Sequence, residues 1–147
     1  MYLYIKNTMV NNTINIIIVD DNVQFRNRLK HFIESELNSN VIAEASNGIE
    51  FLALTNIHSS DIILMDIVMN KMDGFESAQR ILWQNSYLKI IAITMYSEKA
   101  YLQDLVEVGF RGCVFKHSIY DQLPLALEVV KSGNLYFPDN ILFNLKC

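Results

Sequence analysis

Five polar side chains lie at points where apolar runs of the sequence end, namely Asp20, Asp21, Asp66, Thr94 and Lys116. An apolar run bounded by polar residues predicts a strand buried on both faces, and the carboxyl ends of parallel strands meet at one edge of a sheet. Three carboxylates without a neutralising partner repel one another and require a cation, for which Mg²⁺ fits best. A lysine and a hydroxyl beside them suit a phosphoryl group. This set of residues predicts phosphoryl transfer to an aspartate.

The elements that position these residues alternate along the chain. Strands are predicted over 14–19, 41–45, 61–66, 88–94 and 112–116, and helices over 23–37, 49–56, 75–84, 98–108 and 121–132. Gly109 suits a left-handed cap at the end of the fourth helix. Alternation of this kind predicts an α/β fold with a doubly wound parallel sheet and right-handed crossovers.

Composition narrows the class of protein. A chain of 147 residues with 51% hydrophobic residues suits one domain with a sizeable core. A net charge of −4 without a basic patch argues against direct nucleic-acid binding. Apolar runs are too short to span a membrane, and the start lacks a signal-peptide pattern. The two cysteines form no disulfide framework or metal motif, so we expect a cytoplasmic protein with Cys113 buried and Cys147 a free thiol.

The two ends of the chain differ from the part between them. Residues 1–13 fit no periodic pattern and are predicted to be a flexible leader. Residues 134–147 are too apolar for a free tail, which leaves two interpretations: a short helix packed back on the domain, or the start of a linker or docking segment.

At this point the sequence resembles a known family, the receiver domains of two-component response regulators. The resemblance rests on residues 16–21, 63–69, 72–74 and 91–94 and on Lys116, and it covers roughly residues 14–133. It implies a flavodoxin-like (CheY-like) fold with five parallel strands in the order 2-1-3-4-5 and helices on both faces. The NarL/LuxR-type branch of the family is the most similar.

The resemblance also implies a role for each site residue. Asp66 would be the phosphoacceptor, taking its phosphoryl group from a phosphohistidine on a sensor histidine kinase. Asp21, Asp66 and the backbone carbonyl of Val68 would bind Mg²⁺, and Asp20 would act mainly through water. Two further side chains would bind the phosphoryl oxygens: Thr94 and Lys116. Phosphorylation would then draw in these two side chains and shift the region 98–121.

The expected function is therefore a phosphorylation switch that catalyses only its own phosphorylation and dephosphorylation. We expect it to control transcription through a DNA-binding domain that this chain lacks, with a homodimer as a further expectation and no membrane partner. The alternatives are a stand-alone receiver and a phosphorylation-independent interaction module (a pseudo-receiver). A phosphatase is disfavoured because Val68 replaces its second aspartate, and a flavin-binding module is disfavoured because Asp20 and Asp21 would repel a phosphate.

Some residues depart from the family pattern. Cys113 replaces the usual aromatic switch three residues before the lysine, and Asn70 replaces a proline that often follows the acceptor. Met95 is larger than the usual alanine or glycine. We expect Val68 and Tyr96 to flank the site, to hinder the attacking water and to prolong the phosphorylated state.

Overall fold

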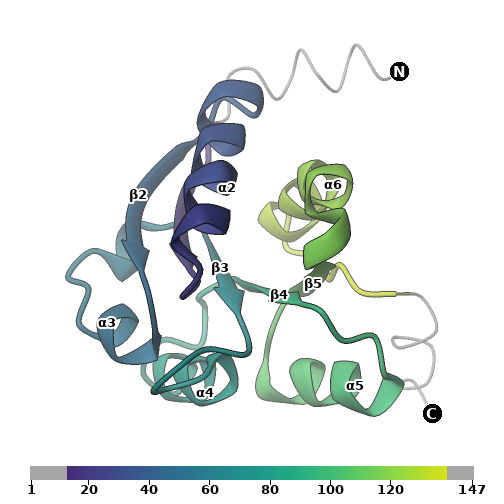
Figure 1. The fold of residues 1–147 in the computed structure, drawn as a ribbon. Helices are drawn as coiled ribbons and strands as arrows, with labels where there is room; N and C mark the ends of the chain where they lie inside the picture. The colour runs from purple at the N-terminus through teal and green to yellow at the C-terminus, as the bar shows by residue number, and fades with distance from the viewer. Residues whose placement is uncertain (1–12, 139–147) are drawn as a thin grey trace.

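The computed structural model describes residues 13–138 of the chain (Figure 1). Strands and helices alternate along it as predicted. The strands are β1 (Asn15–Val19), β2 (Asn40–Ala45), β3 (Ile62–Asp66), β4 (Ile90–Thr94) and β5 (Gly112–Phe115). The helices are α2 (Val23–Glu36), α3 (Gly48–Leu52), α4 (Gly74–Gln84), α5 (Lys99–Val108) and α6 (Ile119–Lys131), with short 3₁₀ turns η1 (Ile57–Ser59) and η2 (Lys116–Ser118). The predicted leader up to residue 12, residues 139–147 and with them Cys147 lie outside the described residues.

All five strands pair in parallel, in the order β2-β1-β3-β4-β5. This order confirms the predicted fold class. The register places Val19 opposite Met65, Asp66 opposite Ile93, and Thr94 opposite Phe115. Strands β1, β3, β4 and β5 therefore end close to one another at the same edge of the sheet, where ligands of such folds bind.

Two apolar layers hold the sheet in place, one on each face. Alternate residues of β1 and β3 point to opposite sides, so Ile17 packs in one layer and Ile18 in the other. The first layer includes residues of α3, α4 and α5, and the second includes residues of α2 and α6. Figure 1 shows the same division, with α2 and α6 on one side of the sheet and α3, α4 and α5 on the other. The strands next to the site are thus buried on both faces and rigid.

Three helices begin with side-chain caps that the sequence supplies. Asn22, Asn47 and Asp73 each accept a hydrogen bond from the backbone N–H three residues further on, at 2.9–3.0 Å. Helix α5 ends at a glycine cap: Gly109 has φ 114°, which confirms the predicted left-handed conformation there. The starts of α2, α3 and α4 are therefore fixed locally; Asn22 follows Asp20 and Asp21 directly, and Asp73 ends the loop that follows Asp66.

Several predicted boundaries were wrong. The helix expected over 49–56 ends at Leu52, because the chain turns back toward β3 and Asn56 donates to the Ile42 carbonyl. The strand expected to end at Lys116 ends one residue earlier, and α6 begins at Ile119. Of the segment 134–147, the described residues 134–138 pack back on the domain without forming a helix: Tyr136 forms a parallel bridge to Gly112, and Phe137 is buried. Among the described residues, no helix has the length and apolar character needed to cross a bilayer.

Candidate functional site

The three predicted carboxylates come together at the carboxyl edge of the sheet. Asp20 directly follows β1, Asp21 is the next residue, and Asp66 is the last residue of β3. Each offers one carboxylate oxygen to a group whose atoms all lie within 4.8 Å of one another. Asp20 and Asp66 are buried, and Asp21 is half-buried. The rigid strands therefore hold like charges at a distance at which they repel one another.

Lys116 points into this group of carboxylates. Its ammonium nitrogen lies 2.9 Å from Asp20 Oδ2 and 3.6 Å from Asp66 Oδ2. The same nitrogen lies 4.3 Å above the centre of the Phe25 ring, a cation–π contact that the sequence did not reveal. Although Lys116 belongs to η2 rather than to a strand, the predicted proximity to the acids is present. Its position leaves it free to contact a group on Asp66.

Thr94 ends the strand next to the one that carries Asp66, and it is almost fully buried. Its hydroxyl oxygen accepts a hydrogen bond from the Tyr96 N–H at 3.0 Å. A hydroxyl that accepts in this way keeps its own hydrogen available for another acceptor. The predicted role of Thr94 toward phosphoryl oxygens stays a prediction, as does that of the Val68 carbonyl.

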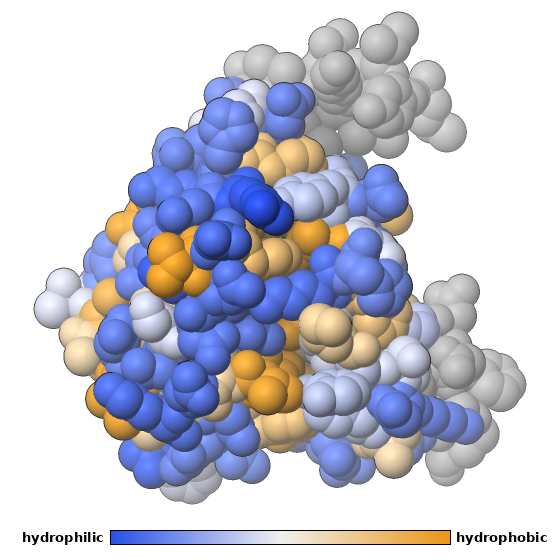
Figure 2. All heavy atoms as spheres, in the orientation of Figure 1, coloured by the Kyte–Doolittle hydropathy of each residue, from blue (hydrophilic) through white to orange (hydrophobic). Residues whose placement is uncertain are grey.

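Val68 lies in the loop between β3 and α4, which passes beside Asp21. The backbone N–H of Asn70 lies 3.4 Å from Asp21 Oδ2, and the Gly74 N–H donates to the Ile67 carbonyl at 2.8 Å. The side chains of Val68 and Met95 are 60% and 67% exposed. Figure 2 shows apolar groups of this kind as separate patches on a mainly hydrophilic face. Tyr96 is exposed as well, at 45%, and the predicted hindrance of attacking water by Val68 and Tyr96 stays a prediction.

The electrostatics of the site centre on Asp66. Burial raises the pKa of its carboxyl from 3.8 to about 7, and the negative charges of Asp20 and Asp21 add to the rise. The Lys116 ammonium and the Ile67 backbone N–H oppose it. An aspartate with this pKa is only partly ionised at neutral pH, and a nearby cation would return it to the charged form.

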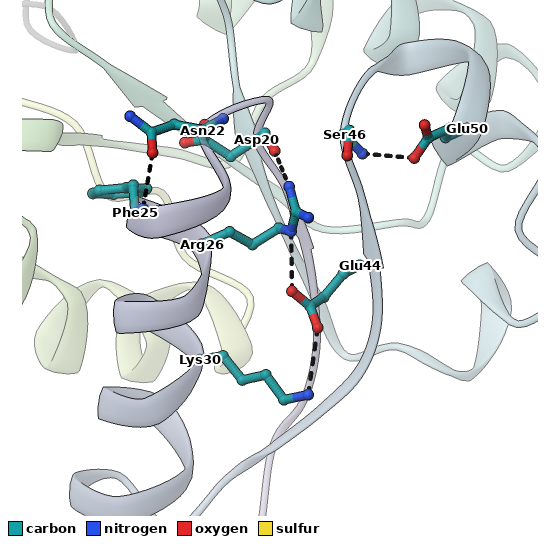
Figure 3. Close-up of polar contacts among 8 residues, drawn as sticks. All are labelled: Asp20, Asn22, Phe25, Arg26, Lys30, Glu44, Ser46 and Glu50. Carbon is teal, nitrogen blue, oxygen red and sulfur yellow. Dashed lines mark hydrogen bonds and ion pairs between the residues drawn. The ribbon is translucent and has the colours of Figure 1, made fainter.

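Sequence reasoning missed an ion network behind the site. Figure 3 shows Arg26 of α2 between the backbone carbonyl of Asp20 and the carboxylate of Glu44 on β2. The Arg26–Glu44 distance is 3.0 Å, and Lys30 adds a second contact to Glu44 at 3.3 Å. Arg26 thus links α2, the end of β1 and β2, directly behind the carboxylates. The sequence shows Arg26 and Glu44 only as two opposite charges 18 residues apart, with no local pattern that predicts their contact.

The oxygen atoms of the three carboxylates suit a divalent cation. Carboxylate oxygens are the ligands that Mg²⁺ prefers, and the three within 4.8 Å carry more negative charge than Lys116 can balance. Burial raises the pKa of Asp66 most, and the negative charges of Asp20 and Asp21 raise it further. A hard cation therefore fits the residues present.

Comparison with known proteins agrees with this geometry. Residues 16–128 match the response regulator receiver domain family. The chain is 32% identical over 120 residues to the transcriptional regulatory protein LiaR of Bacillus subtilis, covering 82% of this chain and 57% of that protein. It is 29% identical over 140 residues to DegU of Brevibacillus brevis, covering 95% of this chain and 59% of that protein. The chain thus spans a little over half the length of these relatives.

Solved structures show the same fold. A two-component response regulator of the LuxR family from Aurantimonas sp. SI85-9A1 superposes with a TM-score of 0.81 and 27% identity, over 92% of this chain and 96% of that one. The isolated receiver domain of RcsB from Salmonella enterica serovar Typhimurium, with phosphomimetic BeF₃⁻, gives a TM-score of 0.76 at 23% identity, over 90% of this chain and 98% of that one. With its acidic cluster at the carboxyl edge of a 2-1-3-4-5 sheet, the chain belongs to the response regulator receiver domain family.

Proposed function

We propose that this domain accepts a phosphoryl group on Asp66 from a sensor histidine kinase and changes conformation in response. One observation carries the proposal. Asp66 is a buried carboxylate at the end of β3, next to two further carboxylates and 3.6 Å from the Lys116 ammonium. A nucleophile, a cation-binding group and a lysine in this arrangement are the parts that phosphoryl transfer requires.

In the proposed reaction, a carboxylate oxygen of Asp66 attacks phosphorus, the phosphorus–nitrogen bond to the kinase histidine breaks, and the imidazole leaves. Mg²⁺ bound by Asp20, Asp21, Asp66 and the Val68 carbonyl would neutralise charge on the carboxylates and the phosphoryl oxygens. Lys116 would pair with a phosphoryl oxygen, and the Thr94 hydroxyl would donate its hydrogen to another. The chain's own contribution is positioning and charge balance, so the only turnover we propose is its own phosphorylation and dephosphorylation.

We propose control of transcription as the output, through a DNA-binding domain in the complete protein. The names of DegU and LiaR, both transcriptional regulatory proteins, support this, as does the fact that this chain spans 59% and 57% of their lengths. DNA and a second copy of the regulator would then be partners of the complete protein, and the kinase a partner of this domain. For this domain, residues 14–133 remain our proposed boundaries.

A phosphorylation-independent interaction module was the alternative. Loss of an acidic residue or of the lysine would favour it. All three carboxylates and Lys116 are present and converge, which supports the phosphorylated switch instead.

The test is incubation of the protein with acetyl phosphate and Mg²⁺, read by intact mass. We expect wild type to gain the mass of one phosphoryl group and Asp66→Asn to gain none. Asp61→Asn is the matched control, because Asp61 precedes β3 and lies at the opposite end of the same strand. The proposal fails if wild type gains no mass, or if Asp66→Asn gains as much as wild type.

A further inference from the structure

Tyr101 presents a buried polar atom that the proposed reaction does not use. Its hydroxyl is buried and has no hydrogen-bond partner among the described residues. The ring is held between two other aromatic rings, edge-to-face, with centroids 5.5 Å from Phe75 and 5.4 Å from Tyr96. Buried hydroxyls normally have a partner, so an unpaired one indicates a partner that is reached in another state.

The groups around this hydroxyl belong to the site. Burial raises the pKa of Tyr101, and the negative charge of Asp66 raises it further. The Thr94 side chain lowers the pKa of Tyr101 as a hydrogen-bonding neighbour, although the geometry does not complete the bond. Tyr101 therefore lies beside Thr94 and within electrostatic reach of Asp66.

Thr94 has the capacity to complete that bond. Its oxygen accepts once, from the Tyr96 N–H, and a hydroxyl oxygen can accept two hydrogen bonds and donate one. One lone pair is left for the Tyr101 O–H while the Thr94 hydrogen points to a phosphoryl oxygen on Asp66. Tyr101 lies in the first turn of α5, so a shift of its hydroxyl toward Thr94 would move that turn.

The neighbouring strand residues Ala92 and Cys113 do not compete with Tyr101 for a hydrogen bond to Thr94. Cys113 of β5 is buried in the same apolar layer as α5, in register with Ala92 of β4. Both are small, and burial raises the pKa of the Cys113 thiol to about 12, so it stays neutral. Neither residue brings an aromatic ring or a strong hydrogen-bond donor to Thr94.

We propose that Tyr101 is a positioning residue that transmits phosphorylation of Asp66 to helix α5 by donating its hydroxyl hydrogen to Thr94. The inference rests on the proposed function, since the Thr94 hydroxyl is engaged by a phosphoryl group. The output surface would then include the first turn of α5, and the signal would travel from β4 directly to the helix without a moving side chain on β5.

The variant that tests this is Tyr101→Phe, which keeps the ring and its two edge-to-face contacts and removes only the hydroxyl. Tyr96→Phe is the matched control, because Tyr96 is the neighbouring ring and is 45% exposed. Each protein is loaded with BeF₃⁻ and Mg²⁺, and amide hydrogen exchange is followed over residues 99–108. Phosphorylation by acetyl phosphate is measured in parallel by intact mass.

We expect wild type and Tyr96→Phe to show the same change in α5 protection on loading, and Tyr101→Phe to show a change about fivefold smaller, as loss of one hydrogen bond implies. Phosphorylation of Tyr101→Phe should match wild type. Its unloaded stability should not fall, because the lost hydroxyl is unpaired in that state. In a Thr94→Val background, Tyr101→Phe should have no further effect on α5.

The outcomes separate the two proposals. Normal phosphorylation of Tyr101→Phe with a wild-type response in α5 overturns the role of Tyr101 alone. Absence of phosphorylation in wild type overturns the proposed function and this inference with it. A reduced α5 response in Tyr96→Phe equal to that in Tyr101→Phe also overturns it, because the effect would then come from the aromatic cluster rather than from the buried hydroxyl.

Discussion

Replacing Asp66 with asparagine should stabilise the metal-free protein at neutral and alkaline pH. The carboxyl of Asp66 has its pKa raised from 3.8 to about 7, chiefly by burial and by the charge of Asp20. Ionising Asp66 therefore costs free energy in the folded protein that it does not cost in the unfolded chain. Asparagine has nearly the same shape and carries no charge, so it removes this cost while disturbing the packing little.

The size of the effect follows from the pKa. A rise from 3.8 to about 7 corresponds to about 4 kcal/mol above pH 7, at about 1.4 kcal/mol for each pH unit. The side chain of Asp66 is only 8% exposed, so solvent screens little of this. The attraction of Lys116, 3.6 Å away, opposes this rise and is already included in the pKa of about 7. We therefore expect Asp66→Asn to raise the free energy of unfolding by about 4 kcal/mol at pH 8.

The sign of the pH dependence is fixed by the same shift. Because the folded-state pKa is the higher one, the folded protein binds a proton more tightly than the unfolded chain between pH 3.8 and about 7. Wild type should lose stability as pH rises through this window and level off above it. The advantage of Asp66→Asn should shrink to about 2 kcal/mol at pH 5.

Urea denaturation in the presence of EDTA, at pH 5 and pH 8, measures both quantities. Asp104→Asn is the control, since Asp104 is an exposed carboxylate on α5 and its loss should change stability by less than about 0.5 kcal/mol. Added Mg²⁺ should stabilise wild type, by about 2.7 kcal/mol at a hundredfold excess over its Kd, and Asp66→Asn less. If Asp66→Asn is no more stable than wild type at pH 8, or if its advantage is the same at pH 5, the charge repulsion inferred here is wrong.

Four further substitutions probe the surroundings of the site. Arg26→Ala should lower the free energy of unfolding by about 1–3 kcal/mol, because the Asp20 carbonyl loses its hydrogen-bond donor. It should also weaken Mg²⁺ binding measured by calorimetry. Arg80→Ala is the control: it breaks only an exposed ion pair within α4 and should change neither quantity measurably. Val68→Asn and Met95→Ala should each speed dephosphorylation several-fold by admitting water, and unchanged rates would refute the shielding role. Gly74→Ala should cost more than about 2 kcal/mol in urea denaturation, because its Cβ would lie 2.5 Å from the Asp66 carbonyl oxygen.

The sequence was sufficient for the sheet and for the convergence of the acids. Each of the runs before Asp20, Asp66 and Thr94 is continuously apolar, a pattern that indicates a strand buried on both faces. Parallel pairing then places the strand ends together whatever the details of the loops. The prediction that Cys113 is buried was confirmed for the same reason, since it lies within β5.

Contacts that depend on the relative placement of two elements were not predictable. The position of Phe25 beneath Lys116 and the link from Arg26 to Glu44 each join residues that are far apart in sequence and lack a local pattern. The unpaired hydroxyl of Tyr101 is of the same kind, because helical periodicity does not show which side-chain atoms find a hydrogen-bond partner. Such contacts arise from how α2 and α5 pack, which periodicity does not specify.

Lys116 lies closer to Asp20 than to Asp66, which explains how one lysine can serve both the unphosphorylated and the phosphorylated site. Its ammonium is closer to Asp20, at 2.9 Å, than to Asp66, at 3.6 Å, and the Phe25 ring supports it from below. A lysine paired tightly with the acceptor would occupy the lone pairs that must attack phosphorus and would hold the pKa of Asp66 low. Held mainly by Asp20, it offsets only part of the rise that burial and the charge of Asp20 impose on the pKa of Asp66, which stays at about 7. The nucleophile therefore depends on a second cation. Phosphorylation would then bring a charge to Asp66 that Lys116 can reach by a small movement away from Asp20.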